Sequence, residues 1–220
     1  MNSSTTVTYF RGFVFLLALG YWFYQFTVTS MDSFGWQFRY LTIWGLTANV
    51  IVAGLMLRFS LGRSDRTHNP LVSATVVLGA MVVFLYWRLW FIDPALVNSD
   101  GPIVWYQEYY LHAVGPALMM FDAFFILGVF QRIWRSLAVS LVIFLSYIAW
   151  SEVLVGPLND SPVGKITNGL PYPFLNDMDG DARTQFYLVT IGTALGFFVA
   201  GVVFAKLISM IRGRSAKVSA

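Results

Sequence analysis

The sequence contains no cysteine and only two histidines, His68 and His112. Without cysteine the chain has no disulfides, thiol nucleophiles, iron–sulfur clusters or cysteine zinc sites. Two histidines are too few for most histidine-rich metal or haem sites. Charged residues are scarce as well: they make up 11% of the chain, against roughly 25% in an average soluble domain. We therefore expect neither a metal site nor a cofactor.

Hydrophobic residues account for 57% of the 220 residues, and the mean hydropathy is +0.65. A soluble fold of this size has too little interior to bury so much apolar surface, because its outside still needs polar cover. Lipid must therefore solvate part of the chain. The composition predicts an integral membrane protein that forms a single domain over residues 1–220.

Six stretches are apolar over about 20 residues, the length that a helix needs to cross a bilayer. The alternation with period two that marks a membrane β-barrel is absent. The first stretch has features of a secretory signal, but no small-residue cleavage site follows it, so we expect it to be retained. The sequence predicts an all-α bundle of six transmembrane helices, at residues 11–29, 39–59, 71–92, 106–130, 134–154 and 185–211.

The basic residues are distributed unevenly between the two sides of this bundle. By the positive-inside rule, their excess on the side of both termini predicts that the termini are cytoplasmic. The isoelectric point of 9.2 is then a topology signal, and we expect no nucleic-acid partner. Ten of the fourteen basic residues lie on that side: Arg11, Arg58, Arg63, Arg66, Arg132, Arg135, Lys206, Arg212, Arg214 and Lys217.

Polar groups inside membrane spans are costly, so each one is a candidate site. Thr42 in the second span and His112 in the fourth both lie about 9 Å inward from the same predicted face, at 1.5 Å per residue. Asn49 lies two turns deeper than Thr42, and Asp122 lies ten residues after His112. Glu108 is one turn before His112 and is in a position to orient its ring. Two other readings stay open: a threonine bonded to its own helix, and a buried histidine bonded to a neighbouring helix.

The loop before the last span contains two prolines one residue apart, which favour an extended segment. Its residues Tyr172 and Phe174 are apolar enough to enter the mouth of the bundle. The run Asp177-x-Asp179-Gly-Asp181 suggests calcium, but it lacks the 12-residue frame and the terminal glutamate of a calcium-binding loop.

Three stretches, taken together, resemble the androgen-induced family of membrane proteins, and the resemblance extends over most of the chain. The order, the spacing and the six-span plan all agree with that family. The matching residues are Arg39-Tyr40-Leu41-Thr42, then His112 with Pro116 and Asp122, and finally Tyr172-Pro173-Phe174-Leu175 with Gly180-x-Ala182-Arg183.

The resemblance implies an intramembrane threonine hydrolase that cleaves fatty-acid esters of hydroxy fatty acids or related lipids. Thr42 would be the nucleophile and His112 the base. The chain looks similar to a bacterial branch of the family, which implies the bacterial cytoplasmic membrane. A substrate with a free carboxylate needs a cation near the mouth of the bundle, and Arg39, Arg88 and Arg183 are predicted on that side. Arg88 is equally suited to pair with Asp93 instead. The candidate substrate-binding residues are Arg39, Arg88, Arg183, Asn49, Asp122, Tyr172 and Phe174.

Three other functions fit the same residues. An acyltransferase would use the Thr42 and His112 pair with an alcohol in place of water. A transporter or lipid-binding protein would use Asp122, Asn49 and Arg88 as a polar path. A purely structural partner subunit needs none of them. The expected partners are membrane lipids and a lipid-ester substrate, and the sequence predicts no oligomeric state.

Overall fold

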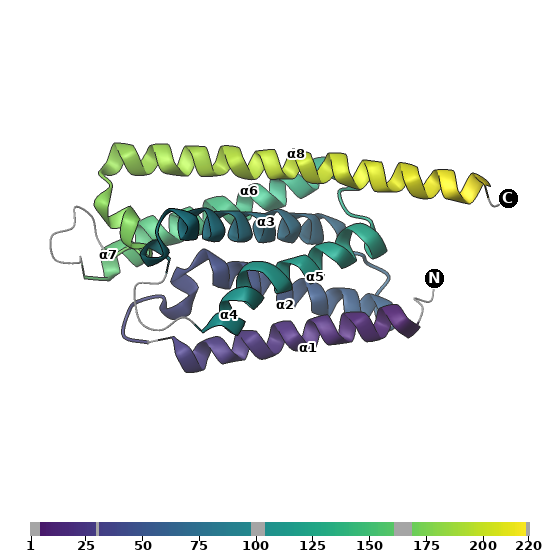
Figure 1. The fold of residues 1–220 in the computed structure, drawn as a ribbon, viewed down its shortest axis with the longest axis horizontal. Coiled ribbons are helices and arrows are strands. Elements are labelled where there is room, and N and C mark those ends of the chain that lie inside the picture. Colours follow the sequence, from purple (N-terminus) through teal and green to yellow (C-terminus); the bar gives the residue numbers. More distant parts are fainter. Residues whose placement is uncertain (1–4, 30, 98–103, 161–168, 219–220) are drawn as a thin grey trace.

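The computed structural model of the protein describes residues 5–29, 31–97, 104–160 and 169–218, so both ends of the predicted domain lie outside it (Figure 1). Within these residues six helical segments are long and apolar enough to cross a membrane. Everything regular in them is helical. The predicted all-α bundle of six spans is therefore confirmed. The start of α1 and the end of α8 lie at the same end of the bundle (Figure 1), as an even number of spans requires.

Four of the six spans are single long helices, and the other two are interrupted. The fourth span, Trp105–Leu127, and the fifth, Ile133–Leu158, each contain wider, π-helical turns. The single helices are α1 (Thr5–Val28), α2 (Leu41–Ser60), α3 (Asn69–Ile92) and α8 (Gly180–Val218). The fourth span consists of α4 (Trp105–Tyr109), a π turn (Tyr110–Val114), α5 (Gly115–Phe121) and a π turn (Asp122–Leu127). The fifth consists of α6 (Ile133–Ala149), a π turn (Trp150–Val155) and α7 (Gly156–Leu158).

Each π-helical turn ends at a glycine, and two of these glycines precede a proline. The glycine N–H bonds the carbonyl five residues earlier, which gives the wider turn. Where a proline follows the glycine, it has no N–H to donate. The carbonyl four residues before that proline is therefore left without a backbone donor. The three bonds run from Gly115 to Tyr110, from Gly128 to Ala123 and from Gly156 to Ser151.

Helix α3 occupies the centre of the bundle. It packs against α2, α5, α6 and α8, and 56% of its most apolar stretch is buried, against 11% for α8 at the periphery. In a bilayer such contacts are held by close van der Waals packing, since lipid is as apolar as the side chains. Small residues allow the close approach: a Cβ on Gly45 of α2 would meet Val82 of α3 at 3.2 Å.

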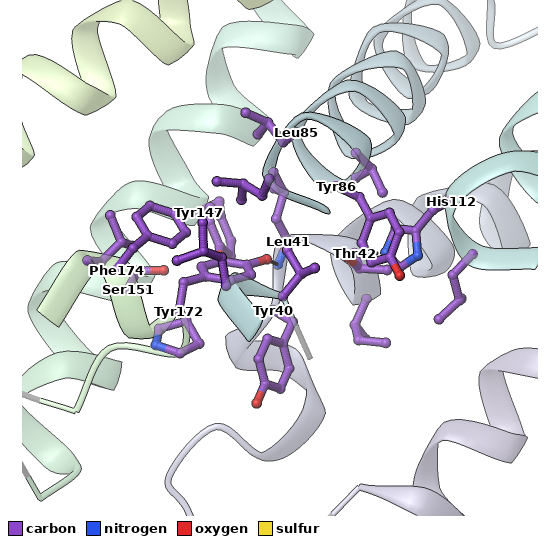
Figure 2. A pocket seen from close by; sticks show the side chains of 18 of the residues that line it. Tyr40, Leu41, Thr42, Leu85, Tyr86, His112, Tyr147, Ser151, Tyr172 and Phe174 are labelled. Atoms are coloured by element: carbon purple, nitrogen blue, oxygen red, sulfur yellow. Dashed lines mark hydrogen bonds between the residues drawn. The ribbon is translucent and has the colours of Figure 1, made fainter. Parts of the chain in front are cut away.

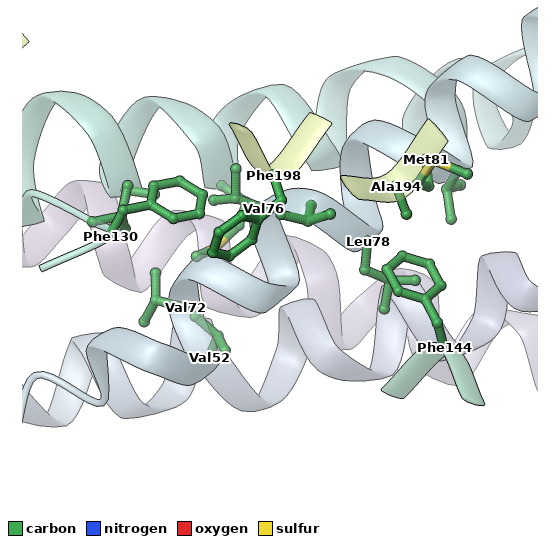
Figure 3. Close-up of a cluster of buried hydrophobic side chains, with 14 of the residues drawn as sticks. Val52, Val72, Val76, Leu78, Met81, Phe130, Phe144, Ala194 and Phe198 are labelled. Atoms are coloured by element: carbon green, nitrogen blue, oxygen red, sulfur yellow. The ribbon is translucent and has the colours of Figure 1, made fainter. Parts of the chain in front are cut away.

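The main apolar cluster fills the space between α3 and its neighbours (Figure 3). Met81 and Val72 of α3 are fully buried at its centre. Figure 3 shows Phe144 of α6 and Phe198 of α8 closing the cluster from two sides. This cluster packs the central helix against its neighbours on several sides.

The first span begins at Thr5 rather than at residue 11, because a charged side chain at the predicted boundary lies inside the helix. Arg11 is only 2% exposed. Its Nε and Nη2 donate to the two carboxylate oxygens of Asp122, each at 2.8 Å, and its Nη1 donates to Ser60 Oγ at 2.6 Å. A buried bidentate pair of this kind lets a charge lie within a membrane helix.

Candidate functional site

Thr42 and His112 lie side by side between α2 and the fourth span. The Thr42 Oγ1 atom is 3.2 Å from Nε2 of His112, although 70 residues separate them in the chain. Figure 2 shows the two side chains facing each other beside Tyr86. The histidine side chain is almost fully buried, with 5% exposure. A hydroxyl and an imidazole thus meet within hydrogen-bonding reach inside the membrane-spanning region.

Glu108 determines which nitrogen of the His112 ring carries the hydrogen. Nδ1 lies 3.1 Å from the Glu108 carboxylate and 3.1 Å from the Glu108 backbone carbonyl. Both of these groups accept hydrogen bonds, so Nδ1 is the protonated nitrogen and Nε2 presents a lone pair to the Thr42 hydroxyl. Thr42, His112 and Glu108 therefore place a hydroxyl, an imidazole and a carboxylate in sequence, an arrangement that can activate a hydroxyl.

The wider turn at residues 110–114 positions His112. Pro116 cannot bond the His112 carbonyl, and Trp87 Nε1 from α3 donates to that carbonyl at 2.8 Å instead. The ring of Tyr86, the neighbouring residue on α3, stacks on the imidazole at 3.6 Å with an interplanar angle of 8°. Two adjacent side chains of the most buried helix thus fix both the backbone and the ring of the histidine.

The start of α2 positions Thr42. Tyr40 has an extended backbone and caps the helix, so Leu41 and Thr42 are its first two residues. The first N–H groups of a helix have no partner within it. The Leu41 N–H donates to the hydroxyl of Tyr172, at 3.1 Å, whereas no described residue accepts a hydrogen bond from the Thr42 N–H.

The loop before α8 carries Tyr172 into this region. The extended segment predicted from the two prolines is wrong in part: Tyr172 is extended, but Pro173–Asp177 form a short 3-10 helix, because proline's fixed φ also suits the first position of a helix. The side chain of Asn176 closes the loop: its Oδ1 accepts from Leu170 N–H at 3.0 Å and its Nδ2 donates to Leu170 C=O at 2.8 Å. The Tyr172 ring packs edge-on to Tyr40 and stacks with Phe174. Burial raises the pKa of Tyr172 to about 12, and the hydrogen bond from Leu41 N–H partly opposes this rise.

A cavity of about 470 Å³ surrounds the Thr42 and His112 pair. It is bounded by α2, α3, the fourth span, α6, the loop before α8, and α8 itself (Figure 2). Apolar side chains dominate, as in most pockets for lipid-like ligands. Among its lining residues are Leu41, Leu85, Leu89, Leu96, Val97, Val104, Phe144, Ile148, Tyr172, Phe174, Phe186 and Ile191.

Of the predicted cations, Arg39 and Arg183 lie near this cavity without lining it in the described part of the chain. The Arg39 Nη2 donates to the Tyr40 hydroxyl at 2.8 Å. The Arg183 Nε pairs with Glu152 at 2.9 Å, and Tyr187, which lines the cavity, also donates to Glu152 at 2.6 Å. Both guanidinium groups keep one buried nitrogen without a partner.

The remaining predicted site residues lie elsewhere. Arg88 is exposed and outside the cavity lining. Asn49 lies in a second, much smaller cavity beneath Thr42, where its Nδ2 donates to the Gly115 carbonyl at 3.4 Å. Asp122 is paired with Arg11 and does not reach the main cavity. The described residues show no cluster of three or more histidine or acidic side chains, so Asp177 and Asp181 do not form such a cluster with Asp179.

Sequence reasoning did not identify Tyr86, Trp87 and Tyr147 as neighbours of the site. Tyr147 lines the cavity and donates to the Arg39 carbonyl at 3.0 Å. All three resemble ordinary aromatic residues near span ends. The Gly115-Pro116 pair was the one local signal, because it frees the carbonyl that Trp87 binds.

A family model described as FAR-17a/AIG1-like protein matches residues 4–206, which include the first five spans and most of the sixth. The chain belongs to the FAR-17a/AIG1-like family. This is the family of androgen-induced gene 1, so the resemblance inferred from the three motifs is confirmed. Searches of curated proteins and of solved structures found no match. Membership of the FAR-17a/AIG1-like family agrees with the multi-pass helical membrane fold.

Proposed function

We propose that this protein is an intramembrane hydrolase of lipid esters in which Thr42 is the nucleophile and His112 the base. One observation carries the proposal: Thr42 Oγ1 lies 3.2 Å from His112 Nε2, and Glu108 holds the opposite nitrogen of the same ring. A threonine hydroxyl is a weak nucleophile by itself and needs such an adjacent base. The chain's membership of the FAR-17a/AIG1-like family agrees with the motif resemblance that implies the same assignment.

Thr42, His112 and one water molecule carry the steps of the reaction. Thr42 Oγ1 bonds to the ester carbonyl carbon while its proton moves to Nε2 of His112, and the carbonyl π electrons move onto the carbonyl oxygen. When the carbonyl re-forms, the ester C–O bond breaks and His112 returns the proton to the departing alkoxide. A water molecule then attacks the acyl-threonine in the same way, and releases the acid and the Thr42 hydroxyl.

The cavity supports a lipid as substrate. Its lining is apolar on the sides formed by α3, α6 and α8, and α8 lies at the periphery of the bundle. Acyl chains gain from leaving water for such a lining, whereas a polar substrate would leave its hydrogen-bonding groups without partners. We infer a fatty-acid ester of a hydroxy fatty acid or a related lipid, and a bacterial cytoplasmic membrane as the location. Arg39 and Arg183 lie near the cavity and each keep an unpartnered nitrogen, so these two cations would bind a substrate carboxylate.

The test measures hydrolysis of a fatty-acid ester of a hydroxy fatty acid by the purified protein in nanodiscs. Thr42→Ala removes the nucleophile, and His112→Ala removes the base. Both variants should lose hydrolysis and labelling by a fluorophosphonate probe, while Thr42→Ser keeps measurable labelling because it keeps a hydroxyl. Thr193→Ala is the matched control, because Thr193 lies on α8 and bonds its own helix at Val189.

Two outcomes would contradict the proposal. Unchanged hydrolysis by a well-folded Thr42→Ala protein removes the nucleophile assignment. Substrate flux into proteoliposomes that is the same with and without the Thr42 hydroxyl favours a transporter. Adding an alcohol acceptor lipid separates a hydrolase from an acyltransferase, since only the acyltransferase gives mainly a new ester in the presence of the acceptor.

A further inference from the structure

The proposed attack by Thr42 creates a negative charge on the carbonyl oxygen, and hydrogen-bond donors must be aimed at that oxygen. In many acyl-transfer enzymes such donors provide the largest single contribution to catalysis. Neither His112 nor Glu108 can serve, because the proton on Nε2 is committed to the leaving group and Glu108 is an acceptor. The described residues around Thr42 must therefore include the donors.

The start of α2 provides one donor, since the N–H of Thr42 has no hydrogen-bond partner among the described residues. A second donor must come from a side chain that lies beside Thr42 and still has a hydrogen to give. Tyr147 does not meet this requirement, because its hydroxyl already donates to the Arg39 carbonyl at 3.0 Å. The Tyr40 hydroxyl is turned to the Arg39 guanidinium.

Tyr172 meets both requirements. Its hydroxyl oxygen accepts the N–H of Leu41, the residue before Thr42, at 3.1 Å. That bond uses a lone pair of the oxygen and leaves the hydroxyl hydrogen available to donate. The ring enters the cavity from the loop before α8 and points toward the start of α2 (Figure 2).

We propose that Tyr172 is a catalytic residue of the hydrolysis, whose hydroxyl donates a hydrogen bond to the oxyanion formed when Thr42 attacks the ester, together with the N–H of Thr42. This assignment rests on the proposed function. The proton stays on Tyr172 throughout: the hydroxyl stabilises the charge on the carbonyl oxygen without transferring its hydrogen. When the carbonyl re-forms, the hydrogen bond weakens again, so the donor favours the transition state over the bound ester.

The surroundings of Tyr172 keep the donor protonated and in place. Burial raises the pKa of its hydroxyl to about 12, so the hydrogen is present at neutral pH. Contacts with Tyr40 and Phe174, and the bonds between Asn176 and Leu170 that close the loop, restrict the motion of the ring. A donor that is fixed before the reaction costs no reorganisation when the charge appears.

The first test is Tyr172→Phe, which removes the hydroxyl and keeps the ring. We expect kcat to fall by about 10²–10³-fold, the usual loss for one oxyanion donor, with little change in KM. Tyr24→Phe is the matched control: Tyr24 lies outside the cavity lining, and its exposed hydroxyl pairs with that of Tyr106. A kcat for Tyr172→Phe within about twofold of wild type would overturn the assignment.

The second test distinguishes a donor from a residue that only supports the helix start. Replacing Tyr172 by 3,5-difluorotyrosine keeps the ring, the oxygen and its bond from Leu41 N–H, but makes the hydroxyl more acidic. The loss of activity at alkaline pH should then begin at lower pH than in the wild type, whereas the same replacement at Tyr24 should leave the pH profile unchanged. A profile that does not move with the replacement at Tyr172 contradicts a donor role.

Failure of this inference is distinguishable from failure of the proposed function. If Thr42→Ala is inactive while both Tyr172 substitutions leave kcat and the pH profile as in the wild type, the threonine hydrolase stands and Tyr172 is not a catalytic residue. If Thr42→Ala keeps full activity, the proposed function itself is wrong, and the assignment of Tyr172 is wrong with it.

Discussion

The indole of Trp87 donates a hydrogen bond to the backbone carbonyl of His112, with Nε1 2.8 Å from the carbonyl oxygen. This carbonyl is free because Pro116, four residues later, has no N–H to offer. A buried carbonyl without a partner is costly in a membrane. Trp87 therefore stabilises the wider turn by bonding the one carbonyl that Pro116 leaves without a backbone donor. The most buried helix of the bundle is thereby attached to the residue that we propose as the base.

We expect Trp87→Phe to lower kcat by roughly ten- to a hundredfold, because the His112 ring is then less well placed against Thr42 and small displacements of catalytic groups cost that much. KM should change little, since Trp87 does not line the cavity. The measurement is steady-state hydrolysis in nanodiscs. Trp134→Phe, at an exposed tryptophan, is the control and should behave as the wild type. An unchanged kcat in Trp87→Phe would mean that the turn holds His112 without this bond.

Glu108→Ala should lower kcat by about tenfold or more without abolishing activity. The carboxylate is one of two groups that accept from Nδ1 of His112, and the backbone carbonyl of residue 108 remains as the second after substitution. The imidazole should therefore keep its tautomer but lose the nearby negative charge that stabilises it when it takes the proton of Thr42. Asp65→Ala, which removes an exposed carboxylate in the loop between α2 and α3, separates this effect from a general loss of a carboxylate. Equal losses in the two variants would argue against an orienting role for Glu108.

The helical fold was predictable because hydrophobicity and length determine which segments cross a membrane. The six spans and their order followed from the six apolar stretches of the sequence, and α1 begins earlier than predicted. The start of α1 was placed too late because Arg11 looked like the end of a span. Its partner Asp122 is 111 residues away, and no local pattern indicates that the two charges meet.

The candidate site was predictable in part. The equal depth of Thr42 and His112 followed from counting residues along two helices. The sequence did not identify the donor to the His112 carbonyl, because many tryptophans near span ends look equivalent until the packing of α3 is known. It also suggested Asp122 as a substrate contact, whereas this carboxylate is paired with Arg11 away from the main cavity.

The Arg11 and Asp122 pair gives a prediction about stability. Asp122→Leu leaves the Arg11 charge buried without its partner, and the loss of one member of a buried pair costs about 3–5 kcal/mol. The double substitution Arg11→Met with Asp122→Leu should recover most of this loss, because no charge remains inside. The measurement is the unfolding of the detergent-solubilised protein, with Arg135→Met as the exposed control.

Hydrolysis by the same double variant tests the place of Asp122 in the reaction. The pair lies away from the cavity, so we expect kcat/KM per folded molecule to equal that of the wild type. A large loss of kcat/KM in a double variant of normal stability would show that Asp122 contributes to substrate binding after all. A double variant as unstable as Asp122→Leu alone would show that the Arg11 and Asp122 pair itself stabilises the fold. The loss in Asp122→Leu would then not come only from an unpaired Arg11 charge.

Gly115 gives the sharpest prediction on the shape of the fourth span. A Cβ at this position would lie 3.0 Å from the Tyr110 carbonyl oxygen and 3.1 Å from the Tyr110 ring, so Gly115→Ala forces the turn around His112 to shift. We expect a loss of about 1–3 kcal/mol in the free energy of unfolding, typical of an overpacked site. We also expect kcat per folded molecule to fall, because the turn that carries His112 shifts. Gly192→Ala on α8 is the matched control, because a Cβ there meets nothing within 4 Å. If Gly115→Ala keeps full kcat, the small shift that the methyl group requires does not disturb the placement of His112 against Thr42.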